Sequence, residues 1–407
     1  MRTPTLPKWL TAGHFGHTPP RDRSRLRIGI PRVLSMWNVQ QFWIGFLTAL
    51  GIDAQNIVFS SDTSEEQFRR FGKGRATVDC CFPVKCVTGH YGELVFGQKR
   101  GIDILLHPMH YSVPSILKGN VMNTLTCPRD MAAAENIRAG FQKERDLFRE
   151  HNITYLTPFV TLADPRLVPG QLQSALGDAL GLTEQETRNA VSAGYRALDA
   201  FNREMRAESR KIIEWCAANG KPCALVLARP YHMDPGIGHE VESHLQQHGI
   251  PILWTHYLPI DDDIMEWLFG AEIARGEIRN AFDIADVWES SYSNSTNELI
   301  WSAKVAARLP WVTCVLRLSS YECGMDQPTY TPTQRIVEAG GTLYFRFGDL
   351  DETKPAGSVK IRIETIVHYV SQYSDRIIRA KLGALPPCVP LGGGGLARER
   401  TEHESTA

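Results

Sequence analysis

Short apolar runs that alternate with helical stretches constrain the fold of this chain more than any other feature. In the N-terminal part, helical patterns cover residues 37–50 and 64–71. The apolar runs around them are residues 26–31, 56–59, 102–106 and 154–156. Strands that alternate with helices in this way form parallel sheets covered by helices. This part of the chain is therefore predicted to be α/β.

The same alternation returns in the C-terminal part. Its apolar runs are residues 224–228, 250–254, 311–316 and 342–347, and its helical stretches are residues 238–249, 296–309 and 358–373. Residues 183–219, rich in Ala, Arg and Glu, separate the two parts and are long enough for two helices or one long connector. We predict two Rossmann-like or flavodoxin-like domains, each with a parallel sheet.

The predicted organisation has five segments. They are a flexible leader (1–25), a first α/β domain (26–182), a helical connector (183–221), a second α/β domain (222–384) and a disordered tail (385–407). The tail is assigned from its Pro and Gly content.

Composition and charge exclude several classes of function. The 407 residues carry a formal net charge of −1, and Lys and Arg are scattered, so we expect no nucleic-acid partner. No apolar stretch is long enough for a membrane span and no export signal is present, so the predicted location is cytoplasmic. The nine cysteines are an odd number in a large chain, which argues against a disulfide framework.

Three cysteines lie where ligand-binding loops are expected. Pro83 follows Cys81 by two residues, and Pro128 follows Cys127 directly. Because proline suits the first turn of a helix, both cysteines are predicted to precede a helix N-terminus, which favours a thiolate or an anionic cluster. Cys323 lies in a loop after a predicted strand, and Gly324 would let the backbone approach a bulky ligand closely.

Loops at strand ends are the places where open α/β sheets bind ligands, so cysteines from separate loops can converge there. Thiolates favour soft metal sites, chiefly iron–sulfur clusters or zinc. Two alternatives stay open: each cysteine is a small buried hydrophobe, or a neighbour of Cys81 (Cys80 or Cys86) is the ligand. The cysteines predicted to lie in the core are Cys216, Cys223 and Cys314.

Four polar residues and a tyrosine beside these cysteines are further candidates. Lys85 and His90 follow Cys81 on the same predicted helix and could donate hydrogen bonds to cluster sulfurs; the alternative is a solvated helix face. His232, with Tyr231 before it, is the candidate proton carrier; the alternative is a structural histidine in a turn. Glu322 could tune the charge at Cys323; the alternative is an exposed loop acid.

Several ordered segments resemble the activase-related domain of the 2-hydroxyacyl-CoA dehydratase and activase superfamily, over residues 26–380. The matching segments are 29–32 (GIPR), 81–90 (CFPVKCVTGH), 229–235 (RPYHMDP), 323–326 (CGMD) and 356–364 (AGSVKIRIE). This superfamily includes dehydratase subunits and double-cubane cluster reductases.

The resemblance implies a [4Fe–4S] cluster or a double cubane between the two predicted α/β domains, with Cys81, Cys127 and Cys323 as ligands. It implies an oxygen-sensitive electron-transfer or reductase component that receives low-potential electrons from a separate ATPase. No GxxxxGK[ST] loop is present in the chain itself. The substrate would be an acyl-CoA or another small molecule, and a homodimer or a heterodimer with a related subunit stays open, as does whether this chain is itself an enzyme. The alternative functions are a non-catalytic scaffold of such a complex and a structural zinc protein.

Overall fold

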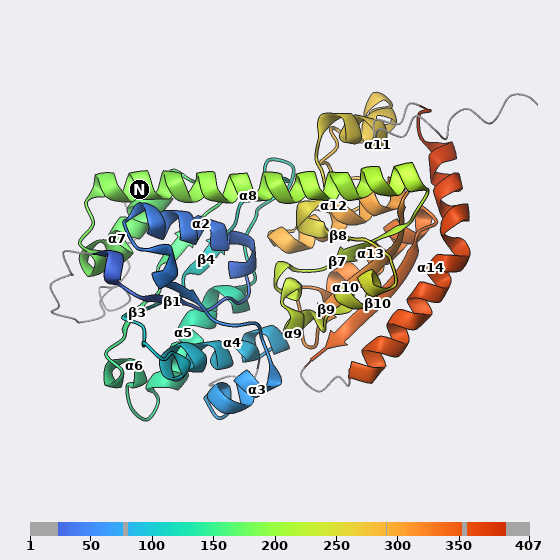
Figure 1. Ribbon diagram of the computed structural model, residues 1–407. Coiled ribbons are helices and arrows are strands. Elements are labelled where there is room, and N and C mark those ends of the chain that lie inside the picture. Colours follow the sequence, from blue (N-terminus) through green and yellow to red (C-terminus); the bar gives the residue numbers. More distant parts are fainter. Residues whose placement is uncertain (1–22, 76–79, 290, 352–355, 388–407) are drawn as a thin grey trace, which may run out of the picture. The chain divides into compact units, whose positions relative to one another are not determined.

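The computed structural model describes residues 23–75, 80–289, 291–351 and 356–387 (Figure 1). The chain divides into two compact units that interleave in sequence. The first comprises the residues up to Ser115, then Thr124–Phe201 and Met233–Ile237. The second comprises Ile116–Asn123, Asn202–His232 and the residues from Gly238 onward. Most of the predicted leader and tail lies outside the described residues.

The first unit contains a parallel sheet of four strands in the order β2-β1-β3-β5. The strands are β1 (Ile28–Ile30), β2 (Ile57–Phe59), β3 (Ile104–Leu106) and β5 (Thr154–Leu156). They coincide with the four apolar runs of the N-terminal part, which confirms that prediction. A second parallel pair consists of β4 (Met109–Ser112) and β6 (Phe159–Thr161), which are separated from β3 and β5 by two residues each.

Two helices of the first unit approach each other closely against this sheet. Helix α2 (Met36–Ala49) buries Phe42 and Phe46 in the same core as Ile28 and Ile30. A Cβ at Gly194, on α8 (Glu184–Asn219), would lie 2.8 Å from the Phe42 carbonyl oxygen, closer than real Cβ atoms come. Glycine is therefore needed inside this helix, although it costs helix stability. The unit's other helices are η1 (Arg23–Arg25), η2 (Ala54–Asn56), α3 (Glu65–Gln67), η3 (Phe68–Gly72), α4 (Phe82–Gly92), η4 (Glu93–Gly97), α5 (Pro128–Gln142), α6 (Leu147–Glu150) and α7 (Val168–Leu180).

The second unit contains a parallel sheet in the order β10-β9-β7-β8. Its strands, β7 (Cys223–Leu227), β8 (Ile252–Trp254), β9 (Val312–Ser320) and β10 (Leu343–Leu350), match the apolar runs of the C-terminal part. The predicted α/β class is therefore confirmed in both units. The helices around this sheet are η5 (Pro230–Met233), α9 (Pro235–Gly238), α10 (Val241–Gln247), η6 (Thr255–Tyr257), α11 (Asp262–Ala274), α12 (Asn294–Arg308), η7 (Gln327–Thr329), α13 (Tyr330–Ala339) and α14 (Ala356–Ala384).

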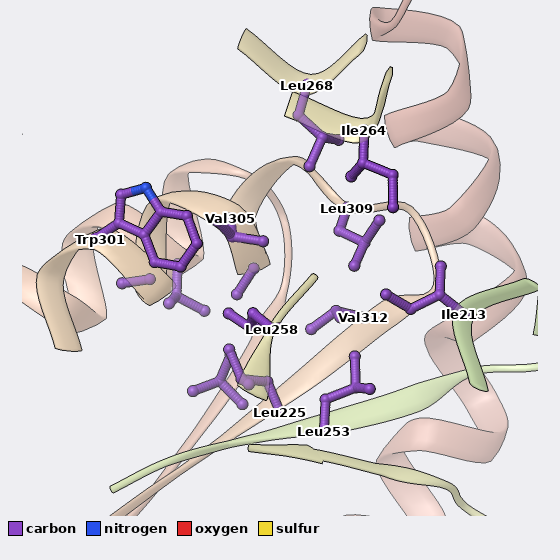
Figure 2. Packing of buried hydrophobic residues seen from close by; sticks show 14 of the residues in the cluster. Ile213, Leu225, Leu253, Leu258, Ile264, Leu268, Trp301, Val305, Leu309 and Val312 are labelled. Atoms are coloured by element: carbon purple, nitrogen blue, oxygen red, sulfur yellow. The ribbon is translucent and has the colours of Figure 1, made fainter. Parts of the chain in front are cut away.

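Both faces of this second sheet are buried. Leu225 of β7 packs with Leu253, Val312 and Trp301 in one cluster, in which strand, α11 and α12 side chains point toward one another (Figure 2). Its neighbour Val226 belongs to another cluster, together with residues of α10 and α14. Successive side chains of a strand point to opposite faces, so β7 serves two cores. The predicted core cysteines are confirmed, because each is fully buried: Cys216, Cys223 and Cys314.

No helix in the described part of the chain is both long and apolar enough to cross a membrane.

Candidate functional site

Cys81 and Cys127 each stand immediately before a helix in the first unit. Cys81 is the N-cap of α4 and Cys127 the N-cap of α5, and each helix has a proline in its first two positions. The sequence predicted this arrangement from Pro83 and Pro128, and it is confirmed. Both thiols therefore lie at the positive end of a helix dipole, near N–H groups that the helix itself leaves unpaired.

The first unit brings these two cysteines together around one arginine. Helices α4 and α5 contact each other, and the Cys127 thiol interacts electrostatically with that of Cys81. The guanidinium of Arg129, in the first turn of α5, hydrogen-bonds the Cys81 sulfur. Its charge also acts on Cys80 and Cys127. The sequence analysis did not single out Arg129. The pattern that could have indicated it is a positively charged residue two positions after the candidate ligand Cys127.

Burial governs the protonation of Cys81 in the metal-free protein. Burial raises the pKa of the Cys81 thiol, while the hydrogen bond and charge of Arg129 act to lower it. The net pKa is raised, so burial outweighs the helix terminus that the sequence analysis expected to favour the thiolate. The raised pKa makes Cys81 a weak nucleophile near neutral pH.

A chain of hydrogen bonds fixes the start of α5. The Asp130 carboxylate accepts from the Ser35 N–H and hydroxyl, both at 3.1 Å. His110 lies 2.9 Å from the same hydroxyl through Nδ1, and its Nε2 accepts from the Trp43 indole at 3.0 Å. Burial lowers the pKa of His110 to about 3, so the ring is neutral. This network holds the helix that carries Cys127 in place, and the sequence analysis missed His110 because β4 is a short polar strand.

His90 is fully buried among hydroxyl groups on α4. Its Nδ1 lies 2.8 Å from Ser60 Oγ and its Nε2 2.9 Å from Thr63 Oγ1. Because Thr63 donates to Asp234 at 2.8 Å, it accepts the proton of His90 Nε2. Burial lowers the pKa of His90 to about 3. Lys85 is half-buried on the same helix, and its backbone N–H donates to the Cys81 carbonyl at 3.2 Å.

In the second unit, Cys323 lies in a tight loop directly after β9. Its N–H donates to the Ser320 carbonyl, and its own carbonyl accepts from the Asp326 N–H, both at 3.1 Å. The exposed Glu322 adopts a left-handed backbone with φ of 62°. A Cβ added at Gly324 would meet nothing within 4 Å. The loop thus places a buried thiol next to an exposed glycine.

A buried carboxylate joins the Cys323 loop to the segment after β7. Asp326 accepts from Arg229 at 2.9 Å and Ser319 at 2.7 Å, and lies 3.1 Å from Arg317. Burial alone would raise the pKa of Asp326, but the two guanidinium groups outweigh it and hold the pKa well below its usual value. Both arginines are buried as well, so this cluster carries one more positive charge than negative.

His232 orients toward the same loop. Its Nδ1 donates to the Arg229 carbonyl at 3.3 Å, so its Nε2 accepts from the Ser320 hydroxyl at 3.2 Å. Burial lowers the pKa of His232 to about 3, so the imidazole is neutral near neutral pH. The Tyr231 ring lies 4.7 Å from the His232 ring, centroid to centroid.

His256 is a further polar residue at this edge of the second sheet. Its Nδ1 lies 3.1 Å from the Glu298 carboxylate and its Nε2 3.2 Å from the Ala228 carbonyl. Both partners are hydrogen-bond acceptors, so the ring donates to at least one of them. The sequence signal was a histidine two residues after an apolar strand, which the analysis did not use.

The candidate ligands of both units are cysteine thiols, a ligand type that suits a soft metal or an iron–sulfur cluster. Within the described ranges, no three or more His, Cys, Asp or Glu side chains gather in a way that could hold a metal ion. Cys81 and Cys127 belong to the first unit and Cys323 to the second. The first unit thus supplies two neighbouring thiols with a cation, and the second unit supplies one buried thiol. These are ligand types that iron–sulfur clusters use.

Comparison with known proteins gives one informative similarity. Residues 27–258 match the family described as "CoA enzyme activase uncharacterised domain", a range that includes Cys81, Cys127 and His232 but ends before Cys323. No curated protein matches the chain. Among solved structures, one similarity is to a mutant, manganese-bound periplasmic metal-binding protein from Candidatus Liberibacter asiaticus. The two chains share 9% sequence identity with a TM-score of 0.22, over 84% of this chain and 99% of that chain. This similarity is too weak to support a conclusion about fold or function.

Proposed function

Because the chain belongs to the CoA enzyme activase uncharacterised domain family, we propose that it is an iron–sulfur electron-transfer component of a CoA-enzyme system. The observation that carries this proposal is the pairing of Cys81 and Cys127. Both are N-caps of contacting helices, and a guanidinium bonds the Cys81 sulfur. Helix N-termini and a cation together favour an anionic group on these thiols.

Cys81, Cys127 and Cys323 would hold the cluster, which supplies one-electron redox chemistry at low potential when bound. Support for Cys323 as the third ligand comes from its own loop. The thiol is buried in a turn next to the exposed Gly324, and the neighbouring Asp326 is held by the two buried arginines Arg229 and Arg317.

The remaining residues would position the ligands or move protons. Neutral His232 accepts a hydrogen bond from Ser320 in the turn before Cys323. Because burial lowers its pKa to about 3, it is a weak base near neutral pH and would position this turn. Tyr231, Lys85 and Glu322 keep the supporting roles proposed from the sequence. Both ring nitrogens of His90 are engaged by Ser60 and Thr63, so His90 would hold α4 in place and not donate to cluster sulfurs. We propose further that a separate ATPase supplies the electrons, since activase systems couple ATP hydrolysis to electron transfer.

Anaerobic purification followed by iron and sulfide quantitation tests the proposal. We expect brown, air-bleached protein with about four iron and four sulfide per cubane, and an EPR signal after reduction. Replacing Cys81, Cys127 and Cys323 together with Ser should abolish the iron. The matched control is Cys314→Ala, a buried core cysteine whose replacement should leave iron content unchanged.

Three results would count against the proposal. Protein that stays iron-free after anaerobic reconstitution would contradict it directly. Stoichiometric zinc in place of iron would indicate a structural metal site. Full activity of the triple Ser variant in an activase assay would indicate a scaffold.

A further inference from the structure

Helix α12 of the second unit begins beside the loops that follow β8 and β9. The chain passes from β7 to β8 on one side and then crosses back to β9 on the other, so the strand order reverses between β7 and β9. Helix α12 contacts both of these strands and η6, the segment after β8. In its first turn, the Thr296 hydroxyl donates to the Met325 carbonyl of the loop after β9, at 3.5 Å. Open α/β sheets bind ligands at such reversal points, at the carboxyl ends of their strands.

The two residues at the start of α12 carry polar atoms that no residue in the described part of the chain satisfies. Ser293 is the N-cap and has the extended backbone usual there, yet its side chain makes no capping hydrogen bond. The Ser293 hydroxyl and both polar atoms of the Asn294 amide have no hydrogen-bond partner among the described residues. Both residues are only 1% exposed. Because buried polar groups without a partner are rare and costly, this pair favours a bound group at the helix start.

Backbone groups supply further donors at the same place. The N–H of Asn297 donates to the Ser293 carbonyl at 3.2 Å, which closes the first turn of the helix. The N–H groups of residues 294–296 precede that bond and have no acceptor within the helix. Since the Cα–Cβ bonds of a helix tilt toward its N-terminus, the Asn294 side chain leans toward the same end. Amide and hydroxyl donors therefore gather at the positive end of the helix dipole.

Neighbouring contacts hold this helix start in place. The Asn297 side chain accepts from the Ser291 N–H at 3.0 Å and donates to the Ser291 carbonyl at 2.7 Å. The Ser293 N–H donates to the Ser291 hydroxyl at 3.1 Å. Glu298, which follows Asn294 by four residues on the same face of the helix, is engaged with His256 at 3.1 Å. The surroundings of Asn294 are thus fixed by protein contacts in which its own amide takes no part.

We propose that the start of α12 binds a small carboxylate. Its donors are the Ser293 hydroxyl, Asn294 Nδ2 and the N–H groups of the next two residues. These four donors match the four lone-pair directions of a carboxylate, and a single negative charge suits a helix end that carries about half an elementary charge. Asn294 Oδ1 then accepts from a hydroxyl or N–H on the rest of the ligand. The inference goes beyond the proposed function, because the site uses none of the cluster ligands and does not depend on iron.

Saturation-transfer NMR with sodium acetate tests binding to the full chain, at an ionic strength kept constant with sodium chloride. We expect saturable binding to the wild type. Asn294→Ala should weaken it about tenfold or more, because a hydrogen bond to a charged group is lost. The control is Asn219→Ala, which removes an exposed amide of the same unit that donates to Trp215 in its own helix. Acetate binding should be unchanged in this control.

Thermal unfolding without acetate separates a binding role of Asn294 from a structural one. Asn294→Ala should unfold at or above the wild-type temperature, because it removes buried polar atoms that have no partner among the described residues. Asn297→Ala, on the same helix, should unfold at a lower temperature, because both hydrogen bonds to Ser291 are lost. Acetate should then raise the unfolding temperature of the wild type but not that of Asn294→Ala.

Three results would overturn the site: no saturable acetate binding to the wild type, undiminished binding to Asn294→Ala, or a loss of stability in ligand-free Asn294→Ala as large as that in Asn297→Ala. Inorganic phosphate that binds more tightly than acetate and requires Asn294 would overturn the assignment to a carboxylate. None of these measurements reports on iron, so the cluster proposal stands or fails separately.

Discussion

The two regions that carry the candidate ligands stabilise them by opposite means. In the first unit, Cys81 and Cys127 cap helices, and the cation beside them, Arg129, is exposed to solvent. In the second unit, Cys323 lies in the loop after β9, and Asp326 of the same loop is fully buried between two buried arginines. Screening by water weakens an exposed charge, whereas a buried charge network is strong and intolerant of change.

This contrast assigns different tasks to the two sets of charges. The arginine of the first region acts on the ligands directly, and its removal should change the chemistry of the thiols with little effect on folding. The charges of the second region hold the backbone of the Cys323 loop against the segment after β7. Their removal should unfold the loop before any change in chemistry could be measured.

Replacing Asp326 by Asn should give the largest loss of stability. The change leaves Arg229 and Arg317 buried without their carboxylate, which costs about 3–5 kcal/mol in the free energy of unfolding. Urea unfolding at pH 7 measures it. Asp164→Asn, at the exposed pair with Arg166, is the control and should cost no more than about 1 kcal/mol. Equal effects of the two substitutions would show that the buried network does not support the loop.

Acid should weaken the first unit more than the second. Burial lowers the pKa of His90, His107 and His110 in the first unit, and of His232 in the second, to about 3. The unfolded pKa is about 6.5, so between pH 6.5 and 3 the unfolded chain binds more protons and stability falls as pH falls. Each histidine contributes about 1.4 kcal/mol per pH unit within that window.

Hydrogen exchange of the two sheets at pH 7 and pH 5, corrected for intrinsic rates, measures this difference. Amides of β1 and β3 should lose more protection than those of β7 and β9. The His110→Gln variant removes one titrating group and should reduce the pH dependence of the first sheet. Parallel losses in both sheets would mean that the buried histidines do not set the response to acid.

Replacing Gly324 by Ala should have the smallest effect on stability and a visible effect on the cluster. The added Cβ meets nothing within 4 Å, so the free energy of unfolding should change by about 0.5 kcal/mol or less. If the space beside Gly324 receives the cluster, iron retention should fall. Gly236→Ala is the contrast, because its Cβ would overlap the Thr63 carbonyl and destabilise the first unit. Unaltered iron retention in Gly324→Ala would place the cluster elsewhere.

Much of the fold could be predicted because the strands of both main sheets are continuous apolar runs. The polar pair β4 and β6 was missed, since Met109–Ser112 alternates too briefly to indicate a strand. The sequence of residues 183–219 was compatible with two helices or with one long helix, and the structure has one helix, α8. Glycine is required at position 194 of this helix because Phe42 approaches its backbone closely. The interleaving of the two units in sequence could not be predicted either, because the segment with Leu117 belongs to the second unit through tertiary packing alone.

The candidate site was predictable where chemistry is local and unpredictable where it is not. Proline after a cysteine indicated the helix starts at Cys81 and Cys127, and a loop after a strand indicated Cys323. The partners of His90 lie 27 and 30 residues away in the chain, and those of Asp326 up to 97 residues away, so no local pattern could reveal them. For the same reason Arg129 had no visible partner before Cys81 was placed beside it.

The most direct test of the account compares Cys323→Ser with Cys81→Ser, one ligand from each region. Iron and sulfide are measured per chain after anaerobic purification, with EPR of the reduced proteins and Cys314→Ala as the control. We predict that both ligand variants lose most of the iron and the wild-type EPR signal, while the control keeps both. Wild-type iron and an unchanged EPR signal in Cys323→Ser, with loss only in Cys81→Ser, would contradict the proposal that Cys323 is a cluster ligand.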